Sequence, residues 1–176
     1  LMEWFWNGAW RSGVQNGRMF FKDIPEAKGT LDFVGLNDYT HVLVGPASVS
    51  LLKMKFPKRR QEVATEFGYP MYAEGLRRAI EFLAPLNVPI EITENGVADA
   101  EDTLRTEHLR RHLWVLSNAV KDGHDVRSYH HWSLMDNFEW AEGYSMRFGL
   151  HRVDFESQER TLRPSGEVYK AIVGRR

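Results

Sequence analysis

The sequence predicts an α/β fold in which parallel strands alternate with helices. Three segments of strand length, at residues 31–39, 88–96 and 126–134, are separated by stretches whose apolar residues recur at helical spacing. Each segment begins apolar and ends polar, so polar side chains gather at the C-terminal end of each predicted strand. A β/α barrel has its active site at that end, but a whole barrel needs eight such units and typically ~250 residues. The chain is therefore either a small three-unit sheet or part of a larger barrel.

The first half of the chain predicts two helices around the first strand. Residues 1–20 are aromatic and helix-like, and their glycines shorten any helix there. Residues 43–69 mix Gly, Pro and basic residues, which predicts a long loop. A helix is expected to begin at Pro70, whose missing N–H is not needed in the first turn, and to end at Pro85. Its expected apolar face consists of Leu76, Ala79, Ile80 and Leu83.

The second half shows a clearer pattern. An acidic loop at 97–103 precedes a helix that ends at Gly123. After the third strand, residues 143–163 predict a loop or hairpin, and residues 164–173 predict a short helix. The expected apolar faces are Leu109, Leu113, Leu116 and Val120 in the longer helix, and Val168 and Ile172 in the shorter one.

Composition and charge exclude several classes of protein. Hydrophobic residues make up 43% and charged residues 27%, which rules out a disordered chain. Lys plus Arg is 23 and Asp plus Glu is 24, so the net charge of −1 provides no field for a nucleic acid or an anionic membrane. The absence of Cys excludes disulfides and thiolate zinc sites. No apolar run approaches the ~18 residues of a membrane span and no signal peptide is visible, so we expect a cytoplasmic protein.

Polar and aromatic residues at the predicted strand ends are candidates for chemistry. Glu94 ends the second strand, where a desolvated carboxylate serves as nucleophile or base, although a surface Glu there would only cap a helix. Trp132 and the segment 136–140 suit sugar recognition, because ring faces stack on pyranose C–H surfaces and carboxylates accept hydroxyl hydrogen bonds. An aromatic core with surface acids is the alternative. Asn37 and Tyr39 end the first strand, where the Tyr hydroxyl either reaches a neighbouring carboxylate or simply packs.

Other polar features favour structural roles. His108 and His112 have the i, i+4 spacing of a metal-binding pair, but no HExxH motif or third ligand accompanies them, so we expect no metal ion. The basic run at 53–60 lacks the interleaved aromatic residues of a nucleic-acid-binding segment and predicts a solvated loop. His130 and His131 have no Ser or Cys nucleophile motif beside them, so packing or support is expected.

Four stretches together resemble glycoside hydrolase family 1, the β-glucosidase family. They are GTLDFVGLNDYT at 29–40, PIEITENGVAD at 89–99, HWSLMDNFEWAEGYSMRFGLHRVDF at 131–155 and RTLRPSGEVYKAI at 160–172. The resemblance extends over nearly the whole chain, and its ITENG and SLMDNFEWAEGY motifs are long and specific. It implies a (β/α)8 barrel that hydrolyses terminal β-D-glucosides with retention, through a covalent glycosyl-enzyme intermediate and without a cofactor.

The resemblance also implies a role for each matching residue. Glu94 matches the catalytic nucleophile, Tyr39 matches the tyrosine that donates a hydrogen bond to it, and Asn37 matches an asparagine near the catalytic pair. The matching substrate-binding residues are Trp132 under the glycone sugar, Glu139 at its 4- and 6-hydroxyls, Trp140 at the same edge and Phe148 in the pocket lining. A glucoside or oligosaccharide is therefore the expected partner.

One departure from the family is decisive for activity. The family's acid/base glutamate lies in an Asn-Glu-Pro motif near the end of the fourth strand, and this sequence contains no Asn-Glu-Pro. The three predicted strands match the sixth, seventh and eighth of the family, and the first residue is Leu1 rather than Met. Residues 1–176 are thus expected to be the C-terminal part of one barrel domain whose N-terminal part is absent. Such a part is expected to be inactive alone.

Smaller departures and alternatives accompany this interpretation. Asp38 stands where a second Tyr is common, Ser128 where Gly is usual and His130 where an aromatic residue is usual. A non-catalytic carbohydrate-binding protein of the same family is the main alternative function. A self-sufficient three-strand domain with different chemistry is a further one.

Overall fold

The structure is a computed structural model that describes residues 8–41 and 63–174. Its centre is a three-stranded parallel sheet with the order β3-β4-β5. The strands are β3 (Val34–Asn37), β4 (Ile90–Asn95) and β5 (Val126–His131). Helices lie between consecutive strands along the chain, so the predicted parallel β/α arrangement is confirmed.

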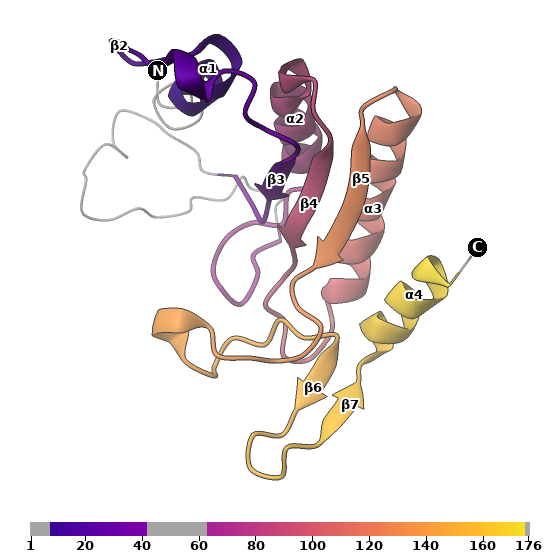
Figure 1. The fold of residues 1–176 in the computed structure, drawn as a ribbon. Helices are drawn as coiled ribbons and strands as arrows, with labels where there is room; N and C mark the ends of the chain where they lie inside the picture. Colours follow the sequence, from indigo (N-terminus) through magenta and orange to yellow (C-terminus); the bar gives the residue numbers. More distant parts are fainter. Residues whose placement is uncertain (1–7, 42–62, 175–176) are drawn as a thin grey trace.

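Two helices cover one face of this sheet (Figure 1). They are α2 (Glu74–Leu83) and α3 (Arg105–Lys121). The core between them and the sheet contains Val34, Leu76, Ile80, Leu83, Ile90, Ile92, Val115 and Ala119. Helix α2 begins at Glu74 rather than at the predicted Pro70, because Pro70 is held in an isolated antiparallel bridge with Ala64.

The buried face of α3 differs from the predicted apolar stripe. Leu109 is fully buried as expected, but Val120 is 48% exposed. The buried residues of this helix are Arg105, His108, Leu109, His112, Val115 and Ala119. Three of these six are polar. A prediction based on apolar residues alone therefore assigned the wrong residues to the buried face of the helix.

Strands β3 and β5 are shorter than predicted. Strand β3 occupies only Val34–Asn37 of the expected 31–39, and β5 ends at His131 rather than at residue 134. The segment after β5 stops pairing with β4 beyond Trp132, because Ser133 pairs with a different segment. The Ser133 N–H donates to the Phe148 carbonyl, and the Ser133 carbonyl accepts from the Leu150 N–H.

The remaining elements surround the sheet. They are α1 (Ala9–Asn16), β1 (Arg18–Met19), β2 (Lys22–Asp23), η2 (Pro25–Ala27), η4 (Ala84–Leu86), η5 (Trp140–Glu142), β6 (His151–Val153), β7 (Arg160–Leu162) and α4 (Pro164–Val173). The predicted hairpin within 143–163 and the predicted helix at 164–173 are confirmed. The basic run at 53–60 lies outside the described residues. In the described part of the chain, no helix is long and apolar enough to cross a membrane.

The arrangement of the strands determines where a site can form. Within residues 8–41 and 63–174, β3 and β5 pair only with β4, so each has one free edge. Because the strands are parallel, their C-terminal ends share one end of the sheet, and the segments that follow β4 and β5 gather there (Figure 1).

Candidate active site

A hydrogen bond joins the ends of β3 and β4. The Tyr39 hydroxyl donates to Glu94 Oε2 at 2.7 Å. The parallel register pairs Asn37 with Glu94, which places Tyr39, two residues further on, within reach of the carboxylate. Burial, this hydrogen bond and the charge of Glu94 all raise the pKa of Tyr39, so its hydroxyl stays protonated and remains a donor. The structure therefore brings together the two residues whose pairing the sequence predicted.

Asn95 cross-links the three strand ends behind this pair. Its side chain is fully buried. Asn95 Nδ2 donates to the Asp38 carbonyl at 2.7 Å, and Asn95 Oδ1 accepts from the Tyr129 hydroxyl at 2.9 Å. The first bond reaches the segment after β3 and the second reaches β5, so one amide fixes the strand that carries Glu94 on both sides.

Gly96 allows the end of β5 to approach β4 closely. The Trp132 N–H donates to the Asn95 carbonyl at 2.9 Å. A Cβ at position 96 would lie 1.9 Å from the Trp132 carbonyl oxygen, so any residue but glycine would push the two segments apart. This contact holds Trp132 beside the end of the strand that carries Glu94.

Trp132 and Glu139 also contact each other. Trp132 Nε1 donates to Glu139 Oε2 in a long hydrogen bond of 3.4 Å. Burial raises the pKa of both Tyr39 and Tyr69, and the negative charge of Glu139 adds to this effect, so this second carboxylate lies near both tyrosines. Phe148 is buried, and its ring meets Tyr39 edge-on with centroids 6.2 Å apart.

Two of the predicted site residues are more exposed than the others. Asn37 is exposed, and its Oδ1 accepts a hydrogen bond from Thr93 Oγ1 at 2.6 Å. Trp140 begins the 3-10 turn η5 and leaves 81% of its surface exposed. The structure therefore does not pack Trp140 against the other predicted residues.

Sequence reasoning missed Tyr69. This residue is buried, and its ring centroid lies 6.5 Å from that of Tyr39 and 5.3 Å from that of Phe67. It belongs to the region interpreted as a long loop. The signal that was available is the pair of aromatic residues around Gly68, immediately before Pro70.

The described residues contain no group of three or more His, Asp, Glu or Cys side chains arranged to hold a metal ion. His108 and His112, the pair with metal-binding spacing, instead stack on each other in the core with ring centroids 3.8 Å apart. What the site offers chemically is a carboxylate fixed by a tyrosine hydroxyl, with a tryptophan and a second carboxylate beside it.

This arrangement agrees with a comparison against known families. The family model described as Glycosyl hydrolase family 1 matches residues 14–176. The chain belongs to this family.

Curated members of glycosyl hydrolase family 1 are similar along most of the chain. A β-galactosidase from Saccharolobus solfataricus is 36% identical, over 96% of this chain and 36% of the relative. A β-glucosidase from an Agrobacterium species is 38% identical, over 86% of this chain and 36% of the relative. The chain therefore spans about a third of the length of these curated relatives.

Solved family 1 structures share the fold. A β-glucosidase from Thermotoga maritima superposes with a TM-score of 0.86 at 30% identity, over 98% of this chain and 45% of that one. A β-glycosidase from Pyrococcus horikoshii superposes with a TM-score of 0.82 at 34% identity, over 97% of this chain and 41% of that one. The α/β fold described above is thus shared with family 1 barrel β-glycosidases, of which this chain covers less than half.

Proposed function

We propose that this chain is the nucleophile-bearing part of a retaining β-glycosidase that hydrolyses terminal β-D-glucosides. The observation that carries the proposal is the 2.7 Å hydrogen bond from Tyr39 to Glu94. A donated hydroxyl favours the ionised form of a carboxylate and orients it, which a nucleophile requires. Membership of the family supports the reaction class. A β-glucosidase from Thermotoga maritima that superposes with a TM-score of 0.85 was solved in complex with glucoimidazole, which supports the choice of sugar.

The reaction follows from the position of Glu94. Its carboxylate attacks the anomeric carbon and forms a covalent glycosyl-enzyme, while the leaving oxygen takes a proton from a second carboxyl group. That second group, ~5–5.5 Å away in retaining glycosidases, belongs to the part of the barrel outside this chain. It then takes a proton from water, the water oxygen attacks the anomeric carbon, and the Glu94 carboxylate is released. Tyr39 donates to Glu94 before and after the covalent step.

The sugar is held by the residues around the end of β5. The Trp132 ring packs under the glycone, where an apolar aromatic face suits the C–H surface of a pyranose. Glu139 accepts hydrogen bonds from a pair of sugar hydroxyls, and Trp132 Nε1 orients its carboxylate. Trp140 follows Glu139 directly and closes the same edge of the sugar, while Asn37 lies beside the catalytic pair.

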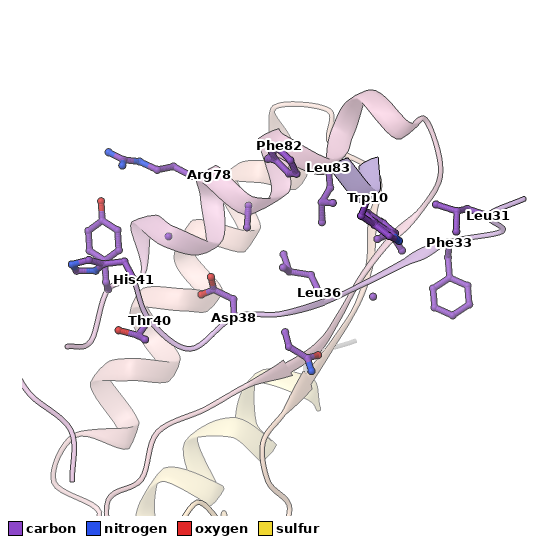
Figure 2. Close-up of a pocket in the computed structure, with 16 residues that line it drawn as sticks. Trp10, Leu31, Phe33, Leu36, Asp38, Thr40, His41, Arg78, Phe82 and Leu83 are labelled. Atoms are coloured by element: carbon purple, nitrogen blue, oxygen red, sulfur yellow. The ribbon is translucent and has the colours of Figure 1, made fainter. Parts of the chain in front are cut away.

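The remainder of the barrel is proposed to join at the free edge of β3, with β3, β4 and β5 as the sixth, seventh and eighth strands. A groove of about 930 Å³ runs beside this edge, between β3 and helices α1 and α2. Trp10, Phe82 and Leu83 lie at one end of the groove, and Asp38 and Thr40 lie at the other (Figure 2). A preceding strand–helix unit would extend the sheet along β3 and bury this apolar surface.

The test restores the missing part of the barrel. Residues 1–176 are joined to the preceding portion of a family 1 β-glucosidase, such as that from Thermotoga maritima, which supplies the acid/base carboxyl. We expect the joined protein to hydrolyse an aryl β-glucoside and Glu94→Ala to abolish turnover. Azide should partly restore turnover and give the inverted glycosyl azide, because a small anion fills the vacated space and attacks.

A surface glutamate provides the matched control. Glu107→Ala changes a solvent-facing side chain of α3, so its activity should equal that of the unaltered joined protein. Near-normal turnover by Glu94→Ala would refute the nucleophile role. Sugar binding without turnover by the unaltered joined protein would favour a non-catalytic binding protein instead.

A further inference from the structure

Three histidines lie together near the strand ends, two of them fully buried and His131 partly buried. His108 and His112 are on α3, with 1% and 0% of their surfaces exposed, and their rings stack. His131 is the last residue of β5, and a charge on it would act on His108. On its other side, the His131 ring lies 6.0 Å from that of Tyr169 on α4. The cluster therefore fills the space where α3 and α4 meet the end of β5.

The rings have almost no hydrogen-bond acceptors. His112 Nδ1 lies 2.8 Å from the His108 carbonyl oxygen, to which it donates in the neutral tautomer protonated there. Both ring nitrogens of His108 and His131, and Nε2 of His112, are buried without a hydrogen bond of normal geometry within the described structure. The Phe148 backbone still lies near enough to His131 to favour its charged form. Protonating any of these nitrogens would place a positive charge in a site that does not solvate it.

The charged groups around the cluster also oppose protonation. The charged and titratable groups that face the three histidines are Arg105 and Arg111 on α3, Glu74 on α2 and Tyr169 on α4. Arg105 is fully buried and acts against a charge on His108 and on His131, and Arg111 acts against one on His112. Glu74 favours a charged His112 more than Arg111 opposes it, but both side chains are exposed, and burial is the largest influence on the pKa of His112.

These surroundings make the stability of the fold depend on pH. Burial lowers the pKa of His112 to about 4 and the pKa of His131 to about 3, and it lowers the pKa of His108 well below its usual value. In the unfolded chain all three titrate near ~6.5. Their contribution to stability is thus complete above pH ~6.5 and is lost as the pH falls towards 4, because only the unfolded chain takes up the protons.

We infer that His108, His112 and His131 form an acid-sensitive latch, which keeps α3 packed against the end of β5 only while all three rings are neutral. His131 directly precedes Trp132, whose N–H donates to the strand that carries Glu94. Opening the latch therefore also releases the residues that position Trp132. The latch itself does not depend on the proposed glycosidase activity, since it concerns packing.

The first test measures the protons taken up on unfolding. Urea unfolding of residues 1–176 joined to the preceding barrel portion is followed by circular dichroism between pH 8 and pH 4, at one fixed protein concentration. With three protons taken up, the unfolding equilibrium constant should rise by up to about 1,000-fold per pH unit below pH ~6. His131→Val should reduce this slope by about tenfold per pH unit. His130→Val is the matched control, because His130 is exposed on the same strand, and it should keep the original slope.

The second test needs no substitution, so it can still test the latch if His131→Val weakens folding. Carbon–proton NMR of the histidine rings in the unaltered joined protein should show three residues that keep the neutral form down to the acid transition. Titration of His108, His112 and His131 near pH 6.5 in the folded chain would overturn the latch. So would an acid slope of one proton or fewer. A joined protein without cooperative unfolding at pH 8 would also overturn it, because no packed cluster would exist to be released.

Discussion

The Tyr39 hydroxyl is expected to contribute strongly to catalysis through its hydrogen bond to Glu94. The hydrogen bond between them joins two neighbouring strands at the carboxylate proposed to attack the sugar. Tyr39→Phe removes this bond and keeps the ring contacts with Tyr69 and Phe148. A hydrogen bond to a charged group is worth ~1.5–3 kcal/mol, so kcat/KM of the joined protein should fall roughly 10- to 100-fold.

Steady-state hydrolysis of an aryl β-glucoside checks this prediction. Tyr144→Phe is the matched control, because this tyrosine is 54% exposed and packs against Phe138 and Phe155 instead. It should have little effect. Unchanged kcat/KM in Tyr39→Phe would show that the hydroxyl does not assist Glu94.

Asp38 is a second residue whose environment has a measurable consequence. Its carboxyl lies in the groove beside β3, and its Oδ1 is buried without a hydrogen bond (Figure 2). Burial raises the pKa of Asp38 to about 7, so the folded chain holds a proton that the unfolded chain releases near pH 4. This carboxyl therefore does not lower the free energy of unfolding below pH ~4, where it is protonated in both states. It lowers that free energy increasingly as the pH rises towards 7.

Asp38→Asn removes that cost with little change in shape. At pH 8 it should stabilise the fold by roughly 1–3 kcal/mol, and at pH 5 the gain should be smaller. Urea unfolding of both proteins at the two pH values measures the difference. Asp125→Asn, an exposed carboxylate on the turn before β5, serves as control. An equal gain at both pH values would contradict a buried, protonated Asp38.

At the scale of elements, the sequence predicted best where one local signal decided the structure. Helix α4 has the predicted bounds because Pro164, whose missing N–H is not needed in the first turn, starts it. Strand β4 was predicted well because its buried Ile90 and Ile92 alternate with half-buried residues. The ends of β3 and β5 were wrong because bonds to distant segments, such as that from Ser133 to Phe148, end the pairing.

Buried polar residues limited the prediction of faces and of the site. The face of α3 was wrong because Arg105, His108 and His112 turn inward, and hydropathy assigns such residues to solvent. Tyr69 was missed because its contact with Tyr39 crosses 30 positions of the sequence. The Tyr39–Glu94 pair was predicted because the family resemblance implies it, and the structure places Tyr39 just past β3 and Glu94 near the end of the neighbouring β4.

A buried ion pair joins the segment after β5 to the final elements. Asp136 accepts from Arg163 Nη1 at 3.0 Å and Nη2 at 3.1 Å, and also from the Gly149 N–H at 2.9 Å. Arg163→Met would leave the Asp136 charge buried without this partner. It should destabilise the fold by about 3–5 kcal/mol, because only the longer 3.6 Å contact with Arg147 would then offset the buried charge.

An exposed pair provides the comparison for that variant. Arg127 contacts Asp125 in solvent, so Arg127→Met should change the free energy of unfolding by no more than about 1 kcal/mol. Urea unfolding of the two variants measures both effects. Equal effects would mean that the Asp136–Arg163 pair does not support the segment that carries Glu139.

At the scale of the whole molecule, the chain alone is expected to be inactive and poorly stable as a monomer. Without the second carboxyl group the leaving oxygen would depart unprotonated, and general acid catalysis is typically worth ~10²–10⁴-fold. The free edges of β3 and β5 and the groove beside β3 favour association. Size-exclusion chromatography and an aryl β-glucoside assay of residues 1–176 check both expectations. A cooperatively unfolding monomer with turnover like that of a family member would contradict them.

The central claim is that Glu94 is the nucleophile, and trapping the covalent intermediate tests it most directly. Residues 1–176, joined to the acid/base-bearing portion of a family 1 β-glucosidase, are incubated with an activated 2-deoxy-2-fluoro-β-D-glucoside. The digested protein is then analysed by peptide mass spectrometry. We predict one 2-fluoroglucosyl group, attached to Glu94. A label on any other residue, or no label in a protein that turns over the ordinary aryl glucoside, would contradict the claim.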